Sequence, residues 1–148
     1  AALAWLVALA GVSSGRPLRD RLRWIVPPAL RVAEYAGLLW IAALAGPSAV
    51  PAAFALLCAI TFRHYDLVYR LRHRGVTPPG WLNRATGGWD GRLLGGFALA
   101  AAGAVPAGFD IAAALLAVAF VGESIAGWQS FGRTQQPAVY EDEEEDAE

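Results

Sequence analysis

The feature that most constrains this chain is the alternation of apolar segments with short segments rich in arginine. A bilayer's hydrocarbon layer is about 30 Å thick, so a membrane helix rising 1.5 Å per residue needs about 20 apolar residues. The apolar segments occupy residues 1–12, 28–45, 51–62, 93–105 and 109–128. The first segment would need residues upstream to complete a crossing. The sequence predicts an all-α, polytopic membrane helix bundle with about five crossings, the first of them truncated.

The composition agrees with a membrane domain that carries an acidic tail. Of the 148 residues, 56% are hydrophobic and 17% are charged, whereas about 25% of the residues in an ordinary soluble domain are charged. The single cysteine, Cys58, excludes a disulfide scaffold. Residues 141–148 hold seven of the thirteen acids. Because like charges repel and apolar residues are scarce there, we predict a membrane domain over residues 1–131 and a disordered acidic tail over 132–148.

The positions of the arginines predict the orientation of the bundle. Residues 13–23 hold four arginines and residues 63–92 hold six, whereas the expected turns at 46–50 and 106–108 hold no charge. Cytoplasmic loops of membrane proteins concentrate arginine and lysine near the helix ends. We therefore expect an integral membrane protein whose basic loops and C-terminal tail lie in the cytoplasm.

The densest group of polar residues lies in residues 62–74, FRHYDLVYRLRHR. On a helix, Arg63, Asp66 and Arg70 would lie along one stripe. A charge inside a membrane span costs about 2.5–3.5 kcal/mol, so such residues need water, a partner or a function. The arginines could reach the headgroups along the outside of the helix, or they could line a cleft open to the cytoplasm. Reaching the headgroups does not account for His64 and Asp66.

Three other places carry charge near a predicted span. Arg31 and Glu34 stand one helical turn apart, which favours either a mutual ion pair or a polar pocket. Asp90 could cap the helix that follows it. The paired glycines next to Asp90 and Arg92 could also let backbone amides and an arginine approach a phosphate, and both roles can hold together. Glu123 is an acid inside the last apolar segment, where it could lie near the headgroups, meet an arginine of a neighbouring helix or relay protons.

Together these residues predict a polar cleft on the cytoplasmic side. Arginines suit phosphate because their guanidinium groups form paired, charge-assisted hydrogen bonds. The residues expected to bind a phosphate or an anionic headgroup are Arg31, Arg63, Arg70 and Arg92. The other residues expected in the cleft are Glu34, Tyr35, His64, Asp66, Tyr69 and Asp90, with Glu123 as the intramembrane acid.

Other kinds of site find little support in the sequence. His64 and His73 are nine residues apart, so one helix would point them to opposite sides, and we expect no metal. No lysine is present to form a phosphate-binding loop of the G-x-x-x-x-G-K-[ST] type, and no cofactor is expected. Membrane lipids with anionic headgroups are nearer partners for the basic segments than nucleic acid, which we do not expect to bind.

Four segments resemble an uncharacterised bacterial membrane domain that is found C-terminal to CDP-alcohol phosphatidyltransferase domains in multidomain proteins. The segments are residues 26–35, 62–72, 78–82 and 88–94, and the likeness spans about residues 24–131. The resemblance implies the bacterial inner membrane, upstream domains of the same polypeptide as partners, and a role in making phospholipids or polyol phosphates. The transferase motif D-x-x-D-G-x-x-A-R is incomplete here, because Gly87 stands three residues before Asp90-Gly91. We therefore expect no catalytic residues in this chain.

The leading interpretation is a noncatalytic membrane module of a lipid-phosphate biosynthetic protein, binding phosphate or anionic headgroups at the cleft. One alternative is a membrane-embedded enzyme in which His64 and Asp66 act as acid and base. Another is a purely structural or oligomerising membrane anchor. A homo-oligomer is a possible assembly of the chain.

Overall fold

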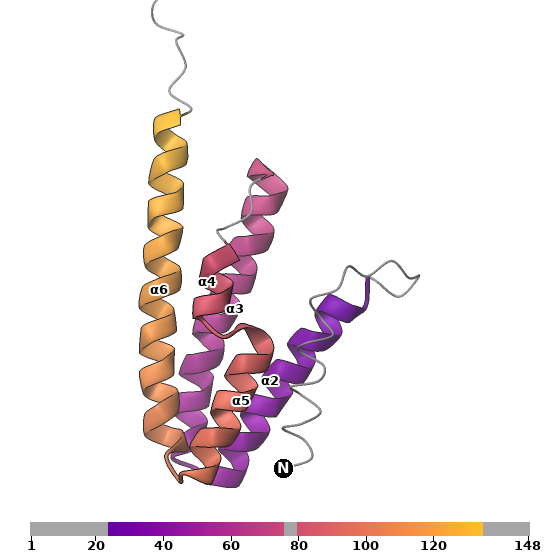
Figure 1. Cartoon of the computed structure of the whole chain (residues 1–148), viewed down its shortest axis with the longest axis vertical. Coiled ribbons are helices and arrows are strands. Elements are labelled where there is room, and N and C mark those ends of the chain that lie inside the picture. The colour runs from indigo at the N-terminus through magenta and orange to yellow at the C-terminus, as the bar shows by residue number, and fades with distance from the viewer. Residues whose placement is uncertain (1–23, 76–79, 135–148) are drawn as a thin grey trace, which may run out of the picture.

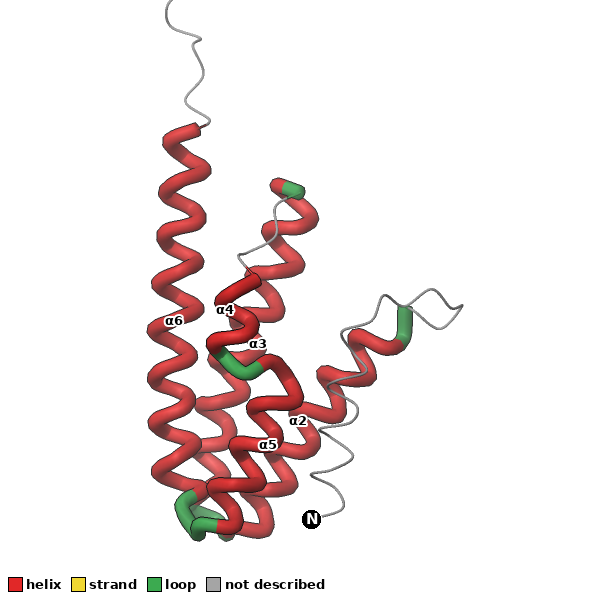
Figure 2. Tube along the Cα trace, in the orientation of Figure 1, coloured by secondary structure: helices red, strands yellow, loops and turns green. Residues whose placement is uncertain are grey.

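The computed structural model describes residues 24–75 and 80–134, and all regular structure in these residues is helical (Figures 1 and 2). The helices are α2 (Val26–Ala45), α3 (Ala49–Arg74), α4 (Gly80–Ala85), α5 (Gly88–Ala101) and α6 (Val105–Thr134). Four of them are long and α4 has six residues. The predicted all-α class is confirmed for these ranges. Residues 1–12 and the tail from 135 onward lie outside them, and α6 continues to Thr134, three residues into the segment predicted to be disordered.

The four long helices gather at the end of the bundle that holds the turns at 46–48 and 102–104 (Figure 1). α3 and α6 form the most extensive pair, and α2 packs against α5 and α3. Away from the turns α2 leans outward, while α3 and α6 extend beyond the other helices (Figure 1). The bundle is therefore tightly joined at its turn end and splays open at its other end.

The turns follow from glycine and proline at particular places. Gly46 ends α2 with φ of 111°, a region that favours glycine. Gly103, with φ of 66°, lies in the turn between α5 and α6. This turn was predicted at residues 106–108, which is wrong. Pro106 instead lies in the first turn of α6, where a proline's missing N–H costs no helical hydrogen bond.

The core of the bundle lies at the turn end and is built from aliphatic and small residues around Phe109, which is 1% exposed. Two glycines let the helices approach closely. A Cβ on Gly96 would lie 3.0 Å from Ile41 Cδ1, and a Cβ on Gly108 would come within 2.6 Å of Leu99. Small residues at helix contacts are the usual means of packing helices when lipid is as apolar as the core.

Two helices of the described residues, not five, are long and apolar enough to cross a membrane: Val26–Ala45 and Val105–Arg133. α5 has 14 residues, which is about 21 Å of helix and less than a bilayer's hydrocarbon layer. The second half of α3 carries charge every few residues. Signal sequences and core helices of soluble proteins can match the same length and composition.

Candidate functional site

A cavity of about 220 Å³ opens where the helices begin to diverge. Three arginines from three different helices face it: Arg31 of α2, Arg63 of α3 and Arg92 of α5. The remaining lining residues are Ile60, His64, Leu67, Gly80, Asn83, Thr86 and Phe120. The cavity is therefore lined by three cationic side chains together with apolar and neutral polar residues.

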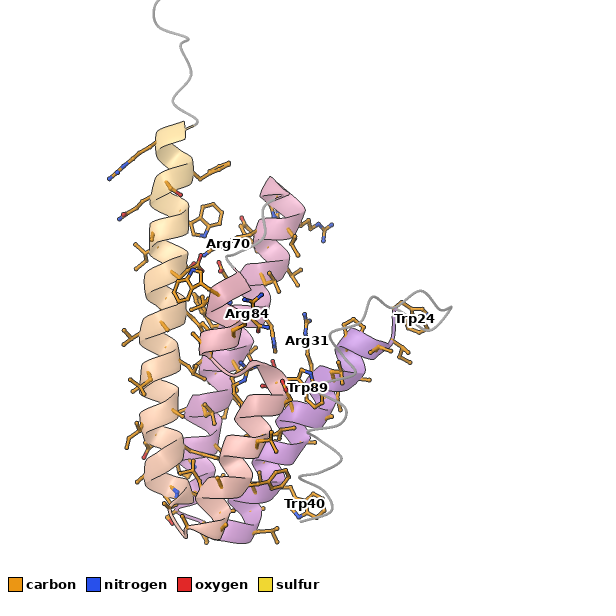
Figure 3. The ribbon with its side chains drawn as sticks, viewed as in Figure 1. Trp24, Arg31, Trp40, Arg70, Arg84 and Trp89 are labelled. Atoms are coloured by element: carbon orange, nitrogen blue, oxygen red, sulfur yellow. The ribbon has the colours of Figure 1, made fainter. Side chains whose placement is uncertain are left out.

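Arg31 and Arg63 lie at one level because the turn at 46–48 joins their two helices. Arg31 lies 14 residues before the end of α2, and Arg63 lies 14 residues after the start of α3. Both are therefore about 21 Å from the turn that joins these antiparallel helices. Figure 3 shows Arg31 with Arg84 and Trp89 in the middle of the bundle, while Trp40 lies near the turn end. Equal distance along neighbouring helices places the side chains at one level.

Arg92 is tied to a fully buried acid. Glu34 is 0% exposed, and its Oε1 accepts a hydrogen bond from Arg92 Nε at 2.5 Å. Arg92 also donates to the carbonyl oxygen of Thr86 at 3.4 Å. Of the two alternatives for Arg31 and Glu34, the mutual ion pair is therefore wrong, since Glu34 pairs with Arg92 across the bundle. Within residues 24–75 and 80–134, Arg31 has no carboxylate partner.

His64 lies in the polar half of α3, outside the two candidate spans, and is held by α2. Tyr35 donates its hydroxyl to His64 Nδ1 at 2.7 Å, and Thr61 donates to the Tyr35 oxygen at 3.2 Å. The pKa of His64 is lowered from 6.5 to about 4, first by burial and then by the positive charges of Arg31, Arg92 and Arg63. His64 is therefore neutral at pH 7, and its Nδ1 can accept a hydrogen bond from the Tyr35 hydroxyl.

A second cluster joins α3 to α6 beside the cavity. Glu123 binds Arg63 and Arg70, each at 2.8 Å, and Asp66 binds Arg70 at 2.9 Å. Ser124 donates its hydroxyl to Asp66 Oδ1 at 2.9 Å. Asp66 and Arg70 are both buried. Two guanidinium groups and two carboxylates thus neutralise one another inside the α3–α6 contact.

The structure separates some residues that the sequence placed in one cleft. Asp66 and Arg70 belong to the α3–α6 cluster and do not line the cavity. Tyr69 lies outside it as well, with its ring 4.1 Å from that of His73 and 5.7 Å from that of Trp128. The acid–base pairing of His64 with Asp66 therefore has no shared space in this cavity.

Asp90 does not cap α5. The N-cap position is Gly87, which makes no side-chain capping bond, and Asp90 lies in the first turn of the helix. An acid there still interacts favourably with the helix dipole. Asp90 is absent from the cavity lining.

Sequence reasoning missed several neutral residues of the site. Asn83 and Thr86 reach the cavity because α4, which was not predicted, folds over its side. Phe120 lies under Arg63, whose guanidinium carbon is 5.5 Å from the ring centroid. Uncharged residues in a loop or in an apolar helix give no signal that would single them out.

The arrangement suits an anion better than a metal. The arginines of the two clusters are Arg31, Arg63, Arg70 and Arg92, and the acids are Glu34, Asp66 and Glu123. One positive charge stays uncompensated among these side chains. Within the described residues no group of three potential metal ligands gathers.

Fold and site together define an all-α protein with two apolar helices of membrane-spanning length and a cationic cavity between its helices. The chain belongs to the family of unknown function DUF5941, whose model matches residues 1–147. The match extends well beyond the likeness expected over residues 24–131. No curated protein and no solved structure matched the chain.

Proposed function

We propose that this chain is a noncatalytic membrane module that binds a phosphate or an anionic headgroup in the cavity between α2, α3, α4 and α5. Arg31 carries the proposal. It faces the cavity without a carboxylate partner among the described residues, whereas Arg63 and Arg92 are both paired with carboxylates. A cation of this kind is available to a ligand.

Placement in a membrane is supported by the distribution of charge. The turns at 46–48 and 102–104 carry no charged residue, and every arginine of the described residues lies toward the splayed end. Large apolar side chains also face outward, including Leu44 and Val118, which are 77% and 74% exposed. The positive-inside rule then puts the cavity near the cytoplasmic leaflet. In this arrangement α2 and α6 cross the bilayer, while α3 and α5 pack between them.

A role in lipid-phosphate biosynthesis is part of the proposal. The support is the resemblance of residues 26–35, 62–72, 78–82 and 88–94 to a bacterial domain found beside CDP-alcohol phosphatidyltransferases. The partners would be upstream domains of the same polypeptide and anionic lipids of the inner membrane. The module would present or retain a phosphate-bearing substrate, and the transferase chemistry would take place in the upstream domain.

A second candidate is a purely structural anchor. The α3–α6 cluster favours it, because its four charged side chains are satisfied by one another. The two candidates differ at Arg31, which a structural anchor does not need.

The experiment measures binding of glycerophosphoglycerol, a phosphodiester without acyl chains, to the full chain in a neutral maltoside micelle. Calorimetric titration gives the affinity. We expect Arg31→Gln to weaken binding by about tenfold or more, since a charge-assisted hydrogen bond contributes about 1.5–3 kcal/mol.

Arg72→Gln is the matched control, because Arg72 is an exposed arginine of α3 that does not line the cavity. It should bind as the unaltered chain does. Equal binding by the Arg31→Gln variant would exclude binding at this cavity. No binding by the unaltered chain would exclude the binding role and leave the structural anchor.

A further inference from the structure

An apolar groove of about 520 Å³ adjoins the cationic cavity. Its α6 wall consists of Ala112, Leu115, Leu116 and Ala119. These positions follow the spacing of one helical face, so they form a continuous apolar strip. The opposite wall comes from α4 and the start of α5.

The groove and the cavity are continuous through two shared residues. Thr86 and Arg92 line both spaces. Arg92 is fixed at this junction by Glu34 on one side and by the Thr86 carbonyl on the other. A molecule that places a negative group against Arg92 therefore has an apolar channel directly beside it.

Glycines keep the groove open on the α5 side. Gly87 and Gly91 line it, and a Cβ built on Gly91 would meet nothing within 4 Å. At the outer end stands Trp81, which is 62% exposed. The groove is thus open beside α5 and is bordered by an aromatic side chain of the kind found at membrane interfaces.

The charge of the site selects among anions. Four arginines face three acids in the two clusters, which leaves one positive charge. A phosphodiester carries one negative charge, whereas a phosphomonoester carries about −1.5 to −2 at pH 7. The cluster is neutralised by the diester and would be overcompensated by the monoester.

We propose that the ligand of this site is a phosphodiester lipid, whose phosphate lies among Arg31, Arg63 and Arg92 and whose acyl chain lies in the groove between α4, α5 and α6. The inference rests on the proposed function, since it names the chemical class bound by the same cavity. It adds contacts between an acyl chain and the groove, which the cavity alone does not provide.

The test compares three ligands on the full chain in a maltoside micelle: dihexanoyl phosphatidylglycerol, glycerophosphoglycerol without chains, and dihexanoylglycerol without phosphate. Two variants separate groove from cavity. Gly91→Leu fills the groove without a backbone clash. Gly95→Leu is the matched control. Gly95 lies one turn further along α5, a Cβ built on it also meets nothing within 4 Å, and it does not line the groove.

We expect Gly91→Leu to weaken binding of the phospholipid by about tenfold or more, because the acyl chain loses its contacts with the groove. Binding of glycerophosphoglycerol, which has no acyl chain, should stay unchanged. Gly95→Leu should bind all ligands as the unaltered chain does. Since all variants are measured in the same detergent, partitioning of the lipid into the micelle affects every variant equally and cancels in the comparison.

The other outcomes separate this inference from the proposed function. Equal affinity for phospholipid and glycerophosphoglycerol, or an unchanged Gly91→Leu variant, overturns the acyl-chain site and leaves anion binding intact. Dihexanoylglycerol binding as tightly as the phospholipid overturns the phosphate site as well. Absence of binding by every ligand overturns both.

Discussion

The two charged clusters contain the same types of residue, arginine and acid, but their arginines differ in whether an acid neutralises them. In the α3–α6 cluster, Arg70 and Asp66 are 4% and 6% exposed and each finds a carboxylate, guanidinium or hydroxyl partner. At the cavity, Arg31 faces open space without an acid among the described residues. An arginine with buried partners stabilises a helix contact, whereas an arginine that faces a cavity without one is available to a ligand. The two kinds of arginine differ in their carboxylate partners and in their exposure to a cavity, and neither can be deduced from the residue type.

The largest effect expected is on stability, from Asp66→Asn in the α3–α6 cluster. The amide side chain would keep hydrogen-bonding groups but would leave Arg70 with one carboxylate fewer in a buried place. Removing one partner of a buried ion pair costs about 3–5 kcal/mol. The measurement is denaturant unfolding of the chain in a mild detergent, followed by tryptophan fluorescence.

Asp110→Asn is its control, since Asp110 is an exposed acid of α6 and its loss changes the net charge equally. The Asp110→Asn variant should unfold within about 0.5 kcal/mol of the unaltered chain. If the two variants unfolded alike, the α3–α6 cluster would not stabilise the fold, and the contrast between the clusters would fail.

An intermediate effect is expected on ligand preference at the cavity. Glu34→Gln removes one negative charge and so raises the uncompensated positive charge by one. The amide oxygen can still accept from Arg92. The more strongly charged cavity should then favour inorganic phosphate relative to glycerophosphoglycerol by about tenfold, or about 1.4 kcal/mol. Calorimetric titration of both ligands measures this preference. An unchanged ratio would show that the charge of the cavity does not select its ligand.

The smallest effect expected is the pH dependence due to His64. Its pKa is about 4 in the folded chain and 6.5 in the unfolded one. Between these values the unfolded chain binds more protons, so stability rises with pH from 4 to 6.5. Because the ring is partly exposed, we expect less than about 1 kcal/mol. A bound anion near Arg31, Arg63 and Arg92 should raise the pKa of His64.

Proton NMR of the two histidine rings checks this prediction. His73 is exposed and contacts Tyr69, so it provides an internal reference. A His64 resonance that titrates at its ordinary pKa in the free chain would contradict the geometry around Tyr35. One that does not move when glycerophosphoglycerol is added would place the anion elsewhere.

Much of the helical framework could be predicted from local sequence. The apolar segment around Leu38 and the prolines before it give α2, and the long pattern from Pro51 to Arg72 falls within α3. The turn between α5 and α6 was wrongly predicted at residues 106–108, because Pro106 fits the start of a helix as well as a turn. α4 gave no periodic signal over its six residues.

The sequence by itself determined the helical class, the apolar lengths of α2 and α6, and the concentration of arginine toward one end, because these depend on residue type and on spacing along one helix. Only the tertiary structure decided which acid neutralises which arginine. Glu34 pairs with Arg92 and not with Arg31 one turn away, and Glu123 binds Arg63 and Arg70 of another helix. Charges from separate helices meet only after the helices pack, so the cavity follows from the angle and level at which α2, α3 and α5 diverge.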